Sequence, residues 1–187
     1  MRDRPSFESN AEDRFAGCQL HGVLVRVFDT GVLLIGESGV GKSECAFDLI
    51  DKGHRLVADD AVQIFCVGGR LQGKSPESIR NLIEVRGVGI VNAVETFGLG
   101  AVSDESDVEL CVELQRGAGA ERFDGSVFDY RILDQTIPKL VLSVSPARSS
   151  ATAVETAVRL HRLRNGGGTP PVERRIGVQA EPLVSVQ

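Results

Sequence analysis

The chain has 187 residues, 42% of them apolar and 25% charged, with a formal net charge of −5, which suits one globular domain and excludes a disordered or fibrous chain. Four cysteines without a Cys-x-x-Cys pair favour a reduced, cytoplasmic protein over a disulfide scaffold or a zinc site. No stretch reaches the ~20 apolar residues of a membrane span, and the mild acidic balance argues against a nucleic-acid binder.

In the first half of the chain, strands and a helix alternate around a glycine-rich stretch. The pattern predicts two strands joined by a turn at 29–31, a helix that ends at Gly53, and two further strands. Gly68-Gly69 predicts a tight turn into a short return strand, and a short helix is expected to open at Pro76. The predicted strands are 23–28, 32–35, 55–58 and 62–67, and the helix is 43–52.

The second half begins with a segment of unusual composition. Residues 84–92 alternate glycine with apolar residues, which is typical of neither a good helix nor an ordinary strand. Strict alternation over 108–114 predicts a half-buried strand, and the acidic residues before it are interpreted as a solvated face. Residues 115–127 are rich in glycine and charge, which indicates a mobile loop. The acidic residues are Asp104, Glu105 and Asp107.

A last strand and helix complete the predicted domain. The strand is expected at 139–144 and the helix at about 149–164. Strands mixed with helices around a glycine turn favour an α/β fold. We therefore expect a polar arm or linker remnant at 1–16, one α/β domain at 17–165, and a Gly- and Pro-containing tail at 166–187.

Residues 36–43 match the phosphate-loop pattern G-x-x-x-x-G-K-[ST]. Glycines let the backbone curl so that successive N–H groups point at phosphate oxygens, and the following helix N-terminus adds partial positive charge. From average residue usage, a chance match should occur in roughly one chain of this length in a hundred. The position between a predicted strand and a predicted helix supports a real nucleotide or polyphosphate site. The loop residues are Gly36, Glu37, Ser38, Gly39, Val40, Gly41, Lys42 and Ser43.

Two adjacent carboxylates, Asp59 and Asp60, end the predicted strand after the loop. A phosphoryl-transfer enzyme needs an acid that holds metal and a residue that manages the acceptor's proton. Because neighbouring strand residues point to opposite faces, only one of the two can face the phosphates unless the strand ends there. Lys42 is expected to reach the β- and γ-phosphates, and the Ser43 hydroxyl to ligate Mg²⁺.

Other polar residues have two interpretations from the sequence alone. His21 before a strand is compatible with a surface role or a catalytic role. Glu84 and Arg86 are compatible with a surface ion pair at a turn, and Arg122 with a mobile phosphate clamp or a solvated side chain. The basic region from Arg148 onward suits either a solvated helix surface or a docking face for an acidic partner.

Four segments in order, 19–25, 36–44, 53–60 and 84–92, give the chain a close resemblance to the catalytic domain of bacterial HPr kinase/phosphorylase. The Glu-Val-Arg-Gly-Val-Gly run is the family-specific part. The resemblance covers about 11–165 and implies a phosphate-loop kinase core resembling phosphoenolpyruvate carboxykinase, a mixed sheet flanked by helices. It also implies a short form or a fragment, because family members usually carry an N-terminal domain.

The resemblance further implies a bifunctional enzyme that acts on a serine of the phosphocarrier protein HPr. Phosphate comes from ATP or pyrophosphate with Mg²⁺, and in the reverse direction inorganic phosphate attacks phosphoserine and pyrophosphate leaves. Family members form homo-hexamers. By the same resemblance, the catalytic residues are His21, Lys42, Asp59 and Arg122, the metal ligands are Ser43 and Glu84, and Asp60, Arg86 and Arg148 support them.

Two other classes of function remain as alternatives. One is another phosphate-loop enzyme such as a small-molecule kinase; a GTPase is disfavoured because the chain lacks an Asn-Lys-x-Asp segment. The other is a nucleotide-sensing interaction module without catalysis. The double aspartate and His21 count against the module, since a sensor needs no group that manages protons.

Overall fold

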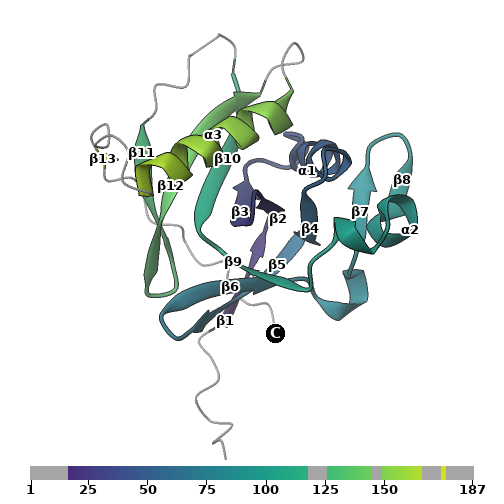
Figure 1. Ribbon diagram of the computed structural model, residues 1–187, viewed down its shortest axis with the longest axis horizontal. Helices are drawn as coiled ribbons and strands as arrows, with labels where there is room; N and C mark the ends of the chain where they lie inside the picture. Colours follow the sequence, from purple (N-terminus) through teal and green to yellow (C-terminus); the bar gives the residue numbers. More distant parts are fainter. Residues whose placement is uncertain (1–16, 118–125, 145–148, 166–173, 176–187) are drawn as a thin grey trace, which may run out of the picture.

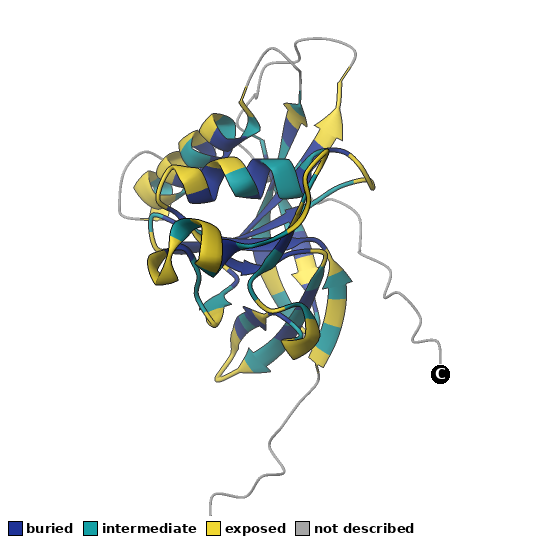
Figure 2. Ribbon diagram, turned by 90° about the vertical axis from the view of Figure 1, so that its right-hand side faces the viewer, coloured by how far each residue is buried: buried dark blue, intermediate teal, exposed yellow. Residues whose placement is uncertain are grey.

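The computed structural model describes residues 17–117, 126–144, 149–165 and 174–175, and these form a layered α/β structure (Figures 1 and 2). Its central layer is a seven-stranded sheet in the order β13-β11-β12-β10-β3-β2-β4. Neighbours β3, β10 and β12 run parallel, whereas β2 is antiparallel to β3 and β4, so the sheet is mixed. The strands are β2 (Val23–Val27), β3 (Thr30–Ile35), β4 (Arg55–Ala58), β10 (Leu110–Arg116), β11 (Val127–Ile132), β12 (Gln135–Val144) and β13 (Arg174–Arg175).

Two helices, α1 (Lys42–Asp51) and α3 (Ser150–Asn165), cover one face of this sheet, as Figure 1 shows. The strand residues that face them are apolar and buried. Leu34 of β3 lies in the same core cluster as Leu49 of α1 and Val154 of α3. Because successive strand residues point to opposite faces, a sheet covered on one side only would leave the alternate residues in water.

The opposite face is covered by a smaller sheet of order β1-β5-β6-β9, which explains why the alternate residues are apolar as well. Leu24 and Leu33 point to this side and pack with Val62 and Ile64 of the small sheet. The large sheet therefore lies between helices and a second sheet. The small sheet is formed by β1 (Gly17–His21), β5 (Ala61–Val67), β6 (Arg70–Lys74) and β9 (Glu105–Asp107).

A β-hairpin with short helical turns lies beside α1, at the right of Figure 1. The rings of Phe47 on α1 and Phe97 on α2 pack edge to face with centroids 5.2 Å apart, which fixes this unit against the helix. Its elements are η1 (Glu77–Ile79), β7 (Leu82–Val85), β8 (Gly89–Asn92), α2 (Ala93–Phe97) and η2 (Leu99–Ala101).

The α/β fold with a mixed sheet flanked by helices is confirmed, while several local predictions are wrong. Residues 84–92 belong to an antiparallel hairpin, in which Glu84 pairs with Ile90. The first turn falls at Phe28-Asp29, where both residues have positive φ, so β3 already begins at Thr30. Strand β10 is buried on both faces, not half-buried, since helices and the second sheet cover it.

Further strands occur where none was predicted. The acidic stretch contains β9, which pairs with β6 at the edge of the small sheet. β10 extends to Arg116 and β11 begins at Val127, so both ends of the predicted loop 115–127 are strand, and 118–125 lies outside the described residues. The arm at 1–16 and most of the tail also lie outside them. Among the described residues, no helix is both long and apolar enough to cross a membrane.

Candidate phosphoryl-transfer site

The phosphate-loop motif connects the end of β3 to the start of α1, as the sequence predicts. Gly36 leaves β3 where β10 passes closely: a Cβ there would lie 2.3 Å from the Leu114 carbonyl oxygen. Lys42 is buried, and its Nζ donates hydrogen bonds to the carbonyl oxygens of Gly36 at 2.9 Å and Glu37 at 3.0 Å. The ammonium group is thus held by the backbone of the loop that precedes it.

Asp59 follows β4 and lies directly against the first turn of α1. Its Oδ1 accepts a hydrogen bond from the Ser43 hydroxyl at 2.9 Å, and its Oδ2 accepts one from the backbone N–H of Glu84 at 3.0 Å. Only 4% of the residue is exposed. Burial raises the pKa of Asp59 above its ordinary value, and the two hydrogen bonds partly offset this effect.

Asp59 and Asp60 both follow the end of β4 at Ala58, and Asp60 is exposed whereas Asp59 is buried. Asp60 has φ of +67°, a left-handed conformation that turns the chain into β5. The Nδ1 of His21 lies 3.0 Å from the Asp60 carbonyl oxygen and 3.2 Å from its Oδ1. His21 and Asp60 are both solvent-accessible, so this pair forms the open rim of the site, while Asp59 forms its floor.

The β7–β8 hairpin forms the other wall of the site. Arg86, in its turn, lies with Nε 3.5 Å from Glu44 Oε1 on α1, which ties the hairpin to the helix that carries Lys42. Glu84 contributes its backbone N–H to Asp59, and its side chain is exposed. Burial lowers the pKa of Lys42, and the surrounding carboxylates, Asp59 first, oppose this shift.

These elements enclose a cavity of about 380 Å³, within the range of roughly 300–1,000 Å³ that is typical of small-molecule sites. It is lined on one side by the loop and the start of α1, and on the other by the strand ends and the hairpin. A polyphosphate placed there would meet loop N–H groups, Lys42 and the acid pair together. The polar lining includes His21, Ser43, Asp59, Asp60, Glu84 and Arg86.

Oxygen ligands suitable for Mg²⁺ are present. This ion usually takes one or two protein ligands and completes its shell with phosphate oxygens and water. The Ser43 hydroxyl and the carboxylates of Asp59 and Glu84 all line the cavity and fit that chemistry. Within the described residues, no group of three or more His, Cys, Asp or Glu side chains forms a closed all-protein metal site.

The structure brings together most of the residues predicted from the sequence. His21, Asp60, Glu84 and Arg86 line one cavity with the loop, although they come from three segments separate from it in the sequence. Three loop residues do not line it: Val40 is buried in the core, and Gly36 and Glu37 use their carbonyls to hold Lys42. Arg122 and Arg148 lie outside the described residues.

Sequence reasoning missed two charged residues at the site. Glu44 lines the cavity and pairs with Arg86, and its place directly after the motif could have drawn attention to it. Arg116 donates a hydrogen bond to the carbonyl of Gly39 in the loop. No motif spacing points to Arg116, because its position depends on the pairing of β10 with β3.

Comparisons with known proteins agree on one family. The profile of the family "HPr Serine kinase C-terminal domain" matches residues 14–174. An HPr kinase/phosphorylase from Thermoanaerobacter sp. (strain X514) is 45% identical over 152 residues, which cover 79% of this chain and 50% of that protein. One from Halalkalibacterium halodurans is 46% identical over 152 residues, with 79% of this chain and 49% of that protein covered.

A solved structure supports the same relationship. The structure of the Hpr(Ser) kinase/phosphatase from Coxiella burnetii superposes with a TM-score of 0.74 at 31% identity. The match covers 80% of this chain and 93% of that chain. The chain spans about half the length of the curated relatives that it matches.

Proposed function

The chain belongs to the HPr serine kinase C-terminal domain family, and we propose that it is the catalytic domain of a protein-serine kinase that phosphorylates HPr. The observation that carries the proposal is the hydrogen bond of 2.9 Å between Ser43 and Asp59. It joins the phosphate loop to a buried carboxylate, so a donor phosphate and a proton acceptor share one cavity.

In the forward reaction, the serine oxygen of the protein substrate attacks the terminal phosphorus of the donor, the bond from that phosphorus to the bridging oxygen breaks, and the serine proton is released. Asp59 is the proposed acceptor of this proton. Both of its oxygens already accept a hydrogen bond, yet an ionised carboxylate offers about four lone-pair sites, so capacity remains. A pKa raised by burial makes Asp59 a stronger base than an exposed aspartate.

The proposed donor is ATP or pyrophosphate. Lys42 and the loop N–H groups would hold the transferred phosphate and the phosphate bonded to it. His21 would orient the Asp60 side chain at the open rim of the site. Ser43 and Glu84 are the proposed Mg²⁺ ligands, and the ion, when bound, supplies charge neutralisation on the phosphate oxygens. Arg86 and Asp60 are proposed to support this arrangement.

Phosphorolysis is the proposed second activity. An oxygen of inorganic phosphate attacks the phosphoserine phosphorus, the bond from that phosphorus to the serine oxygen breaks, and Asp59 returns a proton to the serine oxygen. Pyrophosphate and free serine are the products. Arg122 and Arg148 are proposed to assist this direction. The proposal includes assembly as a homo-hexamer in the cytoplasm and a catalytic domain at 17–165, which the elements from β1 to α3 occupy.

The test incubates the protein with HPr, Mg²⁺ and ATP labelled on its terminal phosphate. We expect label on a serine of HPr, and no label on an HPr variant with alanine at that serine. Addition of excess inorganic phosphate should then release labelled pyrophosphate. Absence of labelled HPr would contradict the kinase activity, and label that persists after phosphate addition would contradict only phosphorolysis.

A further inference from the structure

Arg116 ends strand β10 beside the phosphate loop, and its Nη2 donates a hydrogen bond to the carbonyl oxygen of Gly39. The position of Arg116 is fixed by the backbone. β10 pairs in parallel with β3 up to Glu113 and Ile35, so its carboxyl end runs along the start of the loop. The close approach of the Leu114 carbonyl to the loop, described above, reinforces this placement.

The environment of Arg116 differs from that of the other arginine near the loop tip. Terminal nitrogens of both side chains reach Gly39: a Cβ there would lie 3.4 Å from Arg116 Nη2 and 3.5 Å from Arg86 Nη2. Arg86 is paired with Glu44. Within the described part of the chain, Arg116 has no carboxylate at ion-pair distance, and its hydrogen bond goes to the loop backbone alone.

Both polar atoms of the peptide between Gly39 and Val40 are therefore held. The carbonyl oxygen accepts from Arg116, and the Val40 N–H donates to the Glu37 carbonyl at 3.2 Å. Gly39 has φ of +72°. Because glycine adopts positive and negative φ about equally readily, the backbone of Gly39 does not by itself fix the orientation of this peptide. Arg116 is not part of the cavity lining, whereas Gly39 is, so the carbonyl is bonded to a group outside the cavity.

We propose that Arg116 is a positioning residue, which holds the Gly39 carbonyl away from the donor so that the loop presents N–H groups to the phosphates. A carbonyl oxygen turned inward would repel an anion, and N–H groups turned inward bind it. The inference rests on the proposed phosphate donor. Arg116 acts on the part of the loop that binds phosphate and not on the part of the site that would bind a nucleoside. We therefore expect Arg116 to contribute equally to the affinity for every polyphosphate donor, with or without a nucleoside.

The test measures dissociation constants of Mg²⁺-pyrophosphate and Mg²⁺-ATP by calorimetry for the native protein, Arg116→Met and Arg116→Lys. Loss of one charge-assisted hydrogen bond predicts that Arg116→Met weakens both ligands about tenfold and by the same factor. Arg116→Lys keeps a donor for the carbonyl and should recover most of the affinity. Arg131→Met is the matched control, since Arg131 lies on β11 near the β11–β12 turn, at the opposite end of the parallel strands.

Binding at high salt distinguishes a positioning role of Arg116 from a long-range attraction between its charge and the phosphates. At about 1 M salt the screening length is about 3 Å, so a long-range attraction fades, while a displaced carbonyl still weakens binding. We expect the loss in Arg116→Met to persist there. Binding within twofold of native, a loss that disappears at high salt, or a loss not relieved by lysine would each overturn the inference.

The measurement does not use HPr, so it is independent of the protein substrate. A native protein that binds both ligands but does not phosphorylate HPr would contradict the proposed function, and the variants would still decide the role of Arg116. A native protein that binds neither ligand would overturn both.

Discussion

At the scale of single residues, the site depends on two charged groups that are mostly withdrawn from water. Lys42 and Asp59 are each less than a tenth exposed, and both have hydrogen-bond partners. Burial acts on the two pKa values in opposite directions, lowering that of Lys42 and raising that of Asp59. Each group is therefore closer to its neutral form than in water, which suits a base that must accept a proton.

Replacing Lys42 tests the phosphate cradle. Methionine is unbranched and nearly as long as lysine but removes the charge and the donors, so Lys42→Met should weaken ATP binding on the order of 10- to 100-fold. Calorimetry measures the affinity, and circular dichroism verifies the fold. Arg70→Met, at an exposed position of β6, is the control and should bind ATP as the native protein does. Native affinity in Lys42→Met would contradict the assignment of the cavity.

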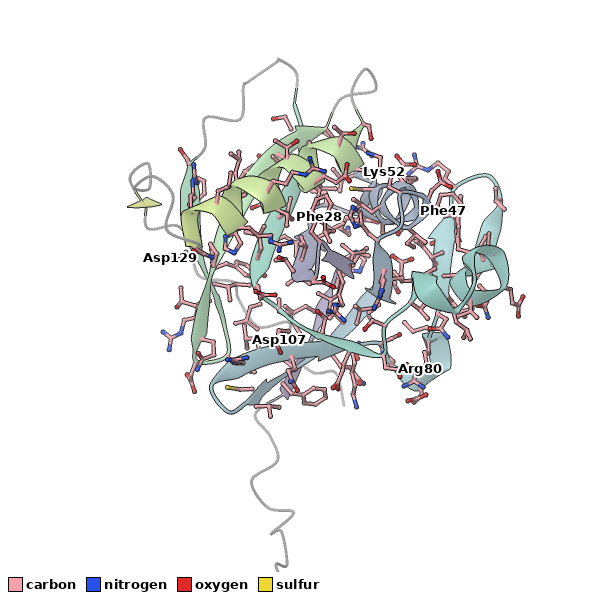
Figure 3. All side chains as sticks on the ribbon, viewed as in Figure 1. Phe28, Phe47, Lys52, Arg80, Asp107 and Asp129 are labelled. Atoms are coloured by element: carbon pink, nitrogen blue, oxygen red, sulfur yellow. The ribbon has the colours of Figure 1, made fainter. Side chains whose placement is uncertain are left out.

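At the scale of elements, the hairpin β7–β8 and the end of β10 both contribute contacts to the site around the phosphate loop. The loop motif alone predicts neither of these elements. A further contact joins the opposite end of α1 to α3. Lys52 Nζ donates to Glu155 Oε2 at 3.1 Å, and His54 Nε2, just beyond the helix, lies 3.0 Å from Glu155 Oε1 (Figure 3 labels Lys52 beside α3). His54 is buried against the ring of Phe28, so the carboxylate connects both helices to the core.

This contact predicts a pH-dependent stability. Burial raises the pKa of Glu155, but the hydrogen bonds from His54 and Lys52 outweigh it, so the pKa lies below its ordinary value of 4.5. A depressed pKa contributes stability that is present above 4.5 and is lost as the pH falls through the folded-state pKa. Glu155→Gln should therefore lower the free energy of unfolding by about 1 kcal/mol at neutral pH, as measured by urea denaturation.

The difference between Glu155→Gln and the native protein should narrow as the medium becomes acidic. Glu77→Gln is the control, because Glu77 is exposed and forms a surface ion pair with Arg80. It should change stability by less than about 0.5 kcal/mol. A deficit in Glu155→Gln that is the same in acid and at neutral pH would show that the carboxylate charge is not the cause.

Part of the site was predictable from the sequence because it is local. The loop motif fixes its own spacing. The double aspartate was expected to turn only one carboxylate to the phosphates unless the strand ended there; β4 does end at Ala58, and both aspartates line the cavity, Asp59 buried and Asp60 exposed. The hairpin was not predictable, since glycines hide its alternation. Arg116 was not either, because its contact with Gly39 depends on strands that are far apart in the sequence.

At the scale of the whole molecule, three layers account for the position of the site. In Figure 2 the helices and the small sheet lie on opposite sides of the large sheet. β3 and β4 each run antiparallel to β2, so their carboxyl ends lie at one edge, where the loop and Asp59 meet. Ligands of open α/β sheets bind at such an edge. The small sheet was not predicted, since nothing local distinguishes its strands from those of the large sheet.

The central claim is that one cavity both binds the donor and transfers its phosphate with Asp59 as the base. The most direct test compares ATP binding and single-turnover phosphorylation of HPr in the native protein and in Asp59→Asn. Asparagine has nearly the same shape but cannot accept the proton, so binding should stay within about threefold while transfer slows about 10²- to 10⁴-fold. Transfer at the native rate, or loss of ATP binding together with transfer, would contradict the claim.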